Sequence, residues 1–190
     1  NASDAETGAP KLSPSTGSLS IELLLNPASQ ANQIVATSSG SSCRWTVFIS
    51  GAASPASCSV GFAVTTQNAN MSTACQIPLG TFSSVCCVYD TTDTLTRLRI
   101  ITNGTLAAVS SGSLLSSLDT TGQLLIGSGS AFAAATYGQI TPSRTLTGSI
   151  DEFRLWRYAR DASSVRADMT RNIFAQDGLV LYYRFNEPPP

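Results

Sequence analysis

The segment SLSIELLL, from Ser18 to Leu25, alternates apolar and polar residues with a period of two. Its apolar positions are Leu19, Ile21, Leu23 and Leu25, and its polar positions include Ser18, Ser20 and Glu22. Side chains point alternately to the two faces of a strand, so this segment predicts a half-buried β-strand with one face on a core. The same alternation recurs in Trp45 to Ile49 and in Cys58 to Val64.

Further strands are predicted along the whole chain, with turn-forming residues between them. They are Val85 to Tyr89, Leu95 to Thr102, Thr105 to Val109, Leu124 to Gly127, Ile150 to Tyr158 and Leu179 to Phe185. Asn103-Gly104 is a strong hairpin signal, because both residues tolerate positive φ. One helix is predicted from about Ala162 to Thr170, with Asp161 placed to cap its N–H groups. This pattern predicts an all-β fold: a two-sheet antiparallel β-sandwich (jelly roll) with one short helix near the C-terminus.

The two ends of the chain differ in composition from the body. Residues 1–17 are polar and rich in Ser, Gly and Pro, which predicts an irregular lead-in. Residues 188–190 are three prolines, which cannot join a strand ladder and favour an extended spacer to a neighbouring module. We therefore expect one sandwich domain over residues 18–187, a size that suits a single large core.

Composition excludes several classes of function. The chain of 190 residues has a net charge of -1 and only 12% charged residues, so no basic surface for nucleic acid is expected. It contains no histidine, which removes the usual base of Ser-His-Asp or Cys-His catalysis and most zinc sites. No apolar run approaches the roughly 20 residues that span a bilayer, so direct membrane insertion is not expected.

Five cysteines lie within one half of the chain, at Cys43, Cys58, Cys75, Cys86 and Cys87. No CxxC pair is present, so the spacing does not indicate a zinc site. We interpret them as two disulfides and one remaining thiol, against the alternative of reduced, buried cysteines. The expected strand order favours a Cys43–Cys75 bond and a bond from Cys58 to either Cys86 or Cys87.

Three Asn-x-Ser/Thr sequons begin at Asn1, Asn70 and Asn103. Each is a candidate N-glycosylation site, and each also occurs by chance in a chain rich in Ser and Thr. Together with the cysteines they favour a secretory route and an extracellular or cell-surface location.

The segment from Gly148 to Ala159, GSIDEFRLWRYA, resembles a signature of laminin-G-like jelly-roll domains in the concanavalin A-like lectin/glucanase superfamily. The segment from Gly178 to Glu187, GLVLYYRFNE, resembles a strand that often opens the next module of a tandem array in that family. The chain departs from the family pattern in two places: Leu24 stands where Trp is usual, and Phe82-Ser83 replaces Trp-His. The resemblance implies the sandwich fold and a frequent role in glycan binding.

Hydrolase chemistry is not expected, although the superfamily includes glycoside hydrolases. Those enzymes need two carboxylates flanking the scissile bond. Asp151 and Glu152 are the sole adjacent pair, and strand neighbours are expected to point to opposite faces. Glu152 and Arg154 are expected to share a face and form an ion pair.

Calcium is the one cofactor that the sequence leaves open. Asp90 and Asp93 lie in one turn and Asp119 lies in another loop, so these are candidate ligands. The alternative is that aspartate simply favours turns. Tyr137, in a Gly/Ala-rich loop, is the candidate for stacking on a sugar, whereas Trp45 and Trp156 fit the core alternation and are expected to be buried.

The first hypothesis is a non-catalytic adhesion or structural module of a cell-surface or matrix glycoprotein, such as part of a surface filament. Its expected partners are other extracellular glycoproteins or glycans and neighbouring modules of the same chain. The alternative is a glycan-binding lectin domain, with or without calcium. A β-glucan hydrolase is the distant alternative.

Overall fold

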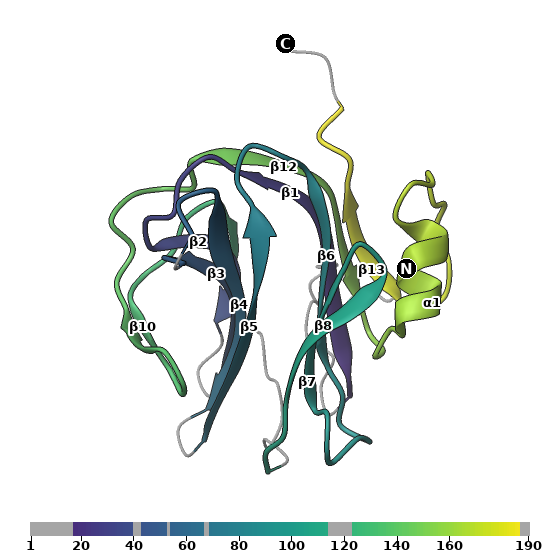
Figure 1. The fold of residues 1–190 in the computed structure, drawn as a ribbon. Coiled ribbons are helices and arrows are strands. Elements are labelled where there is room, and N and C mark those ends of the chain that lie inside the picture. Colours follow the sequence, from purple (N-terminus) through teal and green to yellow (C-terminus); the bar gives the residue numbers. More distant parts are fainter. Residues whose placement is uncertain (1–16, 40–42, 53, 67–68, 114–122, 187–190) are drawn as a thin grey trace.

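The computed structural model describes residues 17–39, 43–52, 54–66, 69–113 and 123–186. Asn1, Asp119, most of the predicted lead-in and the proline spacer at 188–190 lie outside these residues. The described chain forms two large antiparallel sheets packed face to face, with one short helix, as the alternation predicted (Figure 1). Ile150 to Trp156 lies inside a sheet, so the expected position of the signature segment is confirmed.

The six-stranded sheet has the order β13-β12-β1-β6-β7-β8. Its strands are β13 (Leu179–Tyr183), β12 (Gly148–Trp156), β1 (Leu19–Pro27), β6 (Ser83–Tyr89), β7 (Leu98–Thr102) and β8 (Thr105–Ser110). The segment resembling the start of a next module is thus an edge strand of the same sheet, paired antiparallel with β12.

The five-stranded sheet has the order β5-β4-β3-β2-β9. Its strands are β5 (Asn70–Pro78), β4 (Ser57–Thr66), β3 (Cys43–Ser50), β2 (Gln33–Ser39) and β9 (Leu124–Ile126). A hairpin of β10 (Phe132–Ala134) and β11 (Gly138–Ile140) lies against the outer face of this sheet (Figure 1). We call the segment of residues 127–147, which contains this hairpin, the flap.

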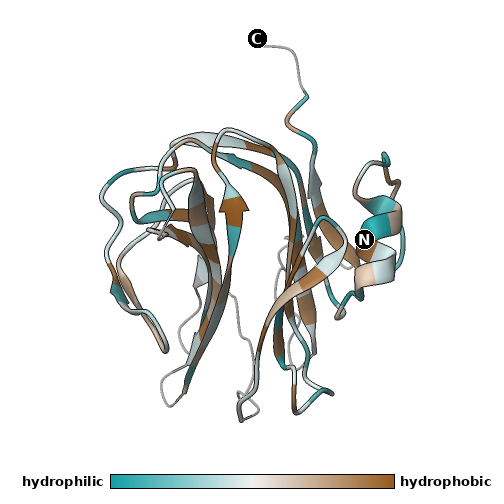
Figure 2. Cartoon of the chain, viewed as in Figure 1, coloured by the Kyte–Doolittle hydropathy of each residue, from teal (hydrophilic) through white to brown (hydrophobic). Residues whose placement is uncertain are grey.

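The main core lies between the two sheets, where the strands carry their apolar residues (Figure 2). The alternating residues of β1 that face it, Leu19, Ile21, Leu23 and Leu25, are at most 2% exposed. Trp45 on β3 and Phe153 on β12 fill the same space. The expected burial of Trp45 and Trp156 is confirmed, with each 1% exposed.

Two smaller cores lie on the outer faces of the sheets. Phe48 packs under Phe132 and Ile140 of the flap. On the opposite side, Val165 of helix α1 (Ala162–Asp168) packs on Cys86 and Val88 of β6. The predicted strand from Val85 to Tyr89 is apolar throughout because α1 covers its outer face. Asp161 caps the helix as expected, and its carboxylate accepts a hydrogen bond of 2.7 Å from the Ser164 N–H.

A β-bulge interrupts β12 at Glu152. Glu22 pairs with Arg154 but Leu24 pairs with Asp151, so two residues of β12 oppose one residue of β1. Glu152 has φ of 53°, in the left-handed region, which is the local bend that a bulge requires. The expectation that Asp151 and Glu152 point to opposite faces is therefore wrong. Asp151 and Arg154 both lie on the outer face by register, and Glu152 contacts Arg154 there.

Candidate functional site

Beneath α1, the outer face of the six-stranded sheet carries a buried set of charged residues. The Glu152 carboxylate accepts a hydrogen bond of 2.7 Å from Arg154, which confirms the predicted ion pair. Arg160 contacts Glu22 at 2.9 Å and Asp168 at 2.6 Å. The two arginines therefore pair with all three acidic side chains of this cluster.

Glu22 lies at the centre of this cluster and is 6% exposed. Burial raises its pKa above the ordinary value, against the opposing effect of Arg160 and Arg154. A raised pKa in a carboxyl group is what a general acid requires. That use requires access for a substrate, and the pocket that Glu22 lines has room for only one water molecule.

One pocket opens between α1 and the sheet. Leu24, Val165 and Met169 line its apolar side, and Glu152 and Arg154 line its polar side. The space open to water is about 10 Å³, which is the room for one water molecule. Arg154 Nε is buried without a hydrogen-bond partner among the described atoms, so it is one polar group that such a water would satisfy. A sugar ring does not fit this pocket.

The structure brings the calcium candidates Asp90 and Asp93 together in the turn before β7. The Arg99 guanidinium lies between them, 2.9 Å from Asp90 and 3.3 Å from Asp93. Both carboxylates also accept hydrogen bonds from the turn itself, including the N–H groups of Thr92 and Thr96. Within the described ranges, no cluster of three or more Asp, Glu, Cys or His side chains suits a metal ion. Calcium binding stays a prediction, and at this turn an ion would have to displace Arg99.

Hydrogen bonds hold these two aspartates ionised. The hydroxyl and N–H of Thr96, the N–H of Leu95 and the charge of Arg99 together lower the pKa of Asp93 to about 2. Burial acts to raise the pKa of Asp90, but hydrogen bonds from Thr92 and Arg99 outweigh it, and the pKa is lowered. The same turn explains why the strand predicted from Leu95 begins only at Leu98.

The two predicted disulfides are not present. All five cysteines lie in the described part of the chain, and no disulfide joins any of them. Cys43 opposes Thr66 of β4, whereas Cys75 opposes Val60, six positions away on the same strand. At about 3.3 Å per residue, that offset alone is roughly 20 Å, far beyond the span of a disulfide.

The second predicted disulfide is absent with either of its possible partners. Cys86 faces α1 on the outer side of its sheet, whereas Cys58 and Cys87 face the main core from opposite sheets. The structure leaves Cys58 and Cys87 unbonded to each other. Burial raises the pKa of Cys58 and Cys75 to about 11, so these thiols behave as small apolar core residues.

The two described sequon asparagines have different surroundings. Asn70, at the start of β5, is partly buried, and its Nδ2 donates a 2.7 Å hydrogen bond to the Ala133 carbonyl of the flap. Asn103 is exposed at the tip of the β7–β8 hairpin. Its φ of 50° and that of 70° at Gly104 confirm the predicted hairpin turn.

Tyr137, the candidate for sugar stacking, lies in the turn between β10 and β11. Its ring packs edge-on against Phe48, with ring centroids 5.9 Å apart, and the residue remains 39% exposed. The backbone N–H of Tyr137 donates to the Ala134 carbonyl, which fixes the turn. Phe48 thus holds an aromatic ring whose remaining surface is open to solvent.

Side chains of the five-stranded sheet fasten the flap that carries Tyr137. Arg44 donates hydrogen bonds to the Ser130 and Ala131 carbonyls and lies 5.2 Å from the centre of the Phe132 ring. The Ser72 hydroxyl accepts from the Thr136 N–H. These fastening residues were not predicted from the sequence. Arg44 had a detectable signal, because it is the one charged residue in an otherwise uncharged strand.

A profile of laminin G domains in the concanavalin A-like lectin/glucanases superfamily matches residues 1–166. The chain belongs to this superfamily. This match confirms the laminin-G-like family that the segment around Trp156 suggested. A comparison with curated proteins gives no match.

Solved structures with the same fold share little sequence with this laminin-G-like chain. A Bacteroides ovatus protein assigned to carbohydrate binding is 20% identical with a TM-score of 0.63, covering 90% of this chain and 46% of that one. The CBM40 of a Ruminococcus gnavus sialidase, bound to α2,3 sialyllactose, is 16% identical with a TM-score of 0.57, covering 81% and 83%. Mouse laminin α1 domains LG4-5 are 16% identical with a TM-score of 0.54, covering 94% and 42%.

These likenesses establish the fold of the laminin-G-like domain. The chain spans less than half the length of the Bacteroides ovatus protein. The described residues form no helix with the length and apolarity needed to cross a membrane.

Proposed function

We propose that this laminin-G-like chain is a non-catalytic module of an extracellular glycoprotein at the cell surface or in the matrix, where it mediates adhesion or assembly, for example within a surface filament. The observation that carries the proposal is the pairing of its sheltered carboxylates with arginines. Glu22 and Glu152 are paired beneath α1, and Asp168 is paired at the end of that helix. Asp90 and Asp93 are paired with Arg99.

A hydrolase of this superfamily would need two carboxylates beside an open substrate cleft. Glu22 has the raised pKa of an acid catalyst, but the pocket above it has room for one water. The bulge places Asp151 and Glu152 on one face, yet Glu152 is held by Arg154 and Tyr182. The geometry therefore favours recognition over glycoside cleavage.

Adhesion is tested with beads that carry the purified chain. Beads that aggregate with one another, or that bind matrix glycoprotein coats, support the proposal. Incubation of the chain with β-glucans, followed by measurement of reducing ends, gives the opposing test. Release of reducing sugar, or beads that bind neither one another nor the coats, would contradict it.

A lectin is the second candidate, and the orientation of Tyr137 favours it. A ring held on one side by Phe48 loses little freedom when a sugar stacks on its open surface. We expect Tyr137→Ala to lose the hits of the intact chain on a glycan array, whereas Tyr137→Phe keeps them. Tyr158→Ala is the matched control, because Tyr158 has a similar exposure of 41% and lies beside Trp156, on the other sheet. Hits that survive in Tyr137→Ala would exclude this surface.

Calcium dependence is checked on the same array. If calcium assists, a chelator abolishes the hits and added calcium restores them. Asp90→Asn tests whether the calcium binds at the turn before β7. It removes one carboxylate and leaves the acceptor oxygen that binds the Thr92 N–H. Hits that do not change with chelator would remove calcium from the proposal.

A further inference from the structure

The two sequons in the described residues, at Asn70 and Asn103, lie in opposite environments. We propose that Asn103 carries an N-linked oligosaccharide and that Asn70 stays unmodified as a fastening residue of the flap. The inference rests on the extracellular location given under the proposed function. It assigns each asparagine a distinct role that the sequons alone do not distinguish.

The side-chain amide of Asn70 is already in use. Its Nδ2 donates to the Ala133 carbonyl at 2.7 Å, and its Oδ1 accepts from the Ala135 N–H at 3.2 Å. Together these bonds join the start of β5 to strand β10 of the flap. The nitrogen that would carry a sugar therefore lies directly against the flap backbone. A glycan there would push the flap off Phe48 and expose the small core beneath it.

In Asn103, only the oxygen of the side-chain amide is hydrogen-bonded among the described residues. Its Oδ1 accepts a 2.9 Å hydrogen bond from the Ser84 N–H, which fixes the side chain. Its Nδ2 makes no hydrogen bond within the described part of the chain, and the residue is exposed. A sugar on Nδ2 leaves the bond to Ser84 intact. Thr105, the hydroxyl residue of this sequon, is exposed at the start of β8.

The chemistry is a glycosyl transfer from a lipid pyrophosphate-linked oligosaccharide. The Asn103 Nδ2 forms a bond to C1 of the first sugar while the bond from C1 to the pyrophosphate oxygen breaks. The lipid pyrophosphate leaves with the electron pair, and one amide proton is lost to a base of the transferase. Transfer precedes completion of the fold, so the finished fold acts as the filter. Chains modified at Asn70 cannot close the flap and are depleted from secreted protein.

The position of Asn103 also indicates which face of the domain the glycan would cover. The turn is tied to α1, because Arg166 donates a 2.8 Å hydrogen bond to the Gly104 carbonyl. The oligosaccharide would therefore stand beside α1, on the outer face of the six-stranded sheet. Tyr137 lies on the other side of the sandwich, over the five-stranded sheet. The glycan thus leaves the flap surface open to partners.

The test is site-resolved mass spectrometry of the full chain secreted from eukaryotic cells. Enzymatic release of N-glycans in heavy-oxygen water converts each modified Asn to a labelled Asp. We expect the label at Asn103 in most molecules and an unlabelled Asn70. Substantial label at Asn70 in folded, secreted protein would overturn the inference, and so would an unlabelled Asn103.

Variants give an independent check. Thr105→Val destroys the sequon while keeping Asn103 and its bond to Ser84, so we expect the loss of one glycan and normal secretion. Asn70→Ala should lose no carbohydrate but should speed amide exchange in the flap. Loss of carbohydrate in Asn70→Ala, or its retention in Thr105→Val, contradicts the proposal. The bead and glycan-array assays use the chain without N-glycans, so a failure of the proposed function is distinguished from a failure of this inference.

Discussion

Asp93 links the stability of the domain to pH. Its pKa is about 2 in the fold, below the ordinary value of 3.8, because Thr96, Leu95 and Arg99 favour the charged form. A lowered pKa stabilises the fold above pH 3.8, and this contribution is lost as pH falls through about 2. We therefore expect the free energy of unfolding to fall less steeply across that range in Asp93→Asn than in the unmodified protein.

Urea unfolding at a series of acidic pH values measures this difference. The variant keeps an oxygen that accepts from the N–H groups of Leu95 and Thr96, so its turn remains formed. Asp177→Asn, at an exposed turn before β13, is the control for the removal of one acidic side chain. Parallel slopes for Asp93→Asn and the unmodified protein would refute the assignment.

The cysteines make a second prediction, which bears on the disulfides expected from the sequence. With a pKa of about 11, the Cys75 thiol is ionised in only about one molecule in 10,000 at pH 7, and burial slows the other thiols further. We expect no reaction with a thiol reagent in the folded protein and reaction of all five cysteines in denaturant. Two disulfides would leave one reactive thiol in denaturant, so that count would restore the sequence-based interpretation.

The flap is the element whose attachment depends most on single side chains. Arg44 joins it through bonds of 2.8 Å to the Ser130 carbonyl and 3.3 Å to the Ala131 carbonyl. Arg44→Met keeps the apolar stem but removes the donors. We expect amide exchange to accelerate across residues 132–140, while the main strands keep their protection. Hydrogen exchange followed by mass spectrometry checks this, and uniform acceleration across β3 and β4 would contradict it.

Elements with one face on the main core could be predicted from the sequence, and elements set by distant contacts could not. β1, β3 and β4 follow from alternation, because burial of one face fixes a period of two. β10 and β11 are three residues each. Their hairpin is held by residues far away in sequence, because Asn70 binds the backbone of β10 and Arg44 binds the backbone just before it. The bulge at Glu152 likewise depends on the register of β1 against β12, which alternation in one strand does not reveal.

In the candidate site, too, contacts between neighbouring residues could be predicted and contacts between distant residues could not. The ion pair of Glu152 with Arg154 and the exposure of Tyr137 follow from neighbouring residues and could be predicted. The contact of Arg160 with Glu22 joins segments well over a hundred positions apart, so the local sequence pattern does not predict it. The disulfide pairing failed for a related reason, because it required the strand offset between Cys43 and Cys75 to be known.

At the level of the whole domain, one core joins the two sheets, and this predicts a single unfolding transition. Leu25 and Val47 come from different sheets and belong to the same buried cluster. Leu25 is 0% exposed, so Leu25→Ala should cost about 3 kcal/mol through lost burial and the cavity left behind. Because the sheets share this core, the loss of stability should appear equally in both sheets.

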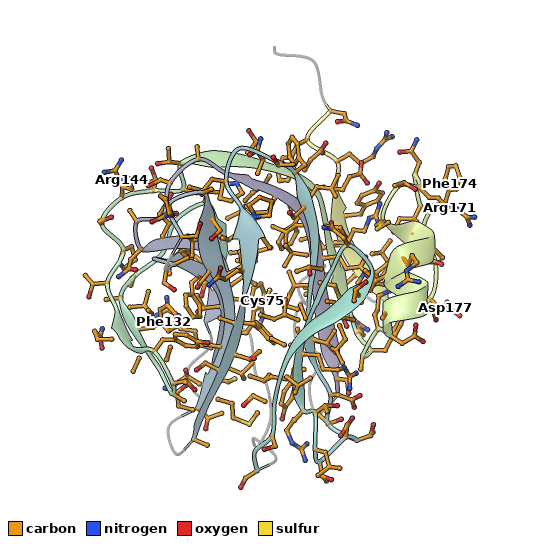
Figure 3. The ribbon with its side chains drawn as sticks, in the orientation of Figure 1. Cys75, Phe132, Arg144, Arg171, Phe174 and Asp177 are labelled. Carbon is orange, nitrogen blue, oxygen red and sulfur yellow. The ribbon has the colours of Figure 1, made fainter. Side chains whose placement is uncertain are left out.

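Two probes recorded on the same samples test this coupling. Circular dichroism follows all the strands, whereas tryptophan fluorescence follows Trp45 in one sheet and Trp156 in the other. We expect the two curves to coincide and to shift together in Leu25→Ala. Phe174→Ala, at a residue that is 85% exposed beyond α1 (Figure 3), should leave the midpoint nearly unchanged. If the curves separate in Leu25→Ala, the sheets unfold independently, and the shared core does not hold the domain together.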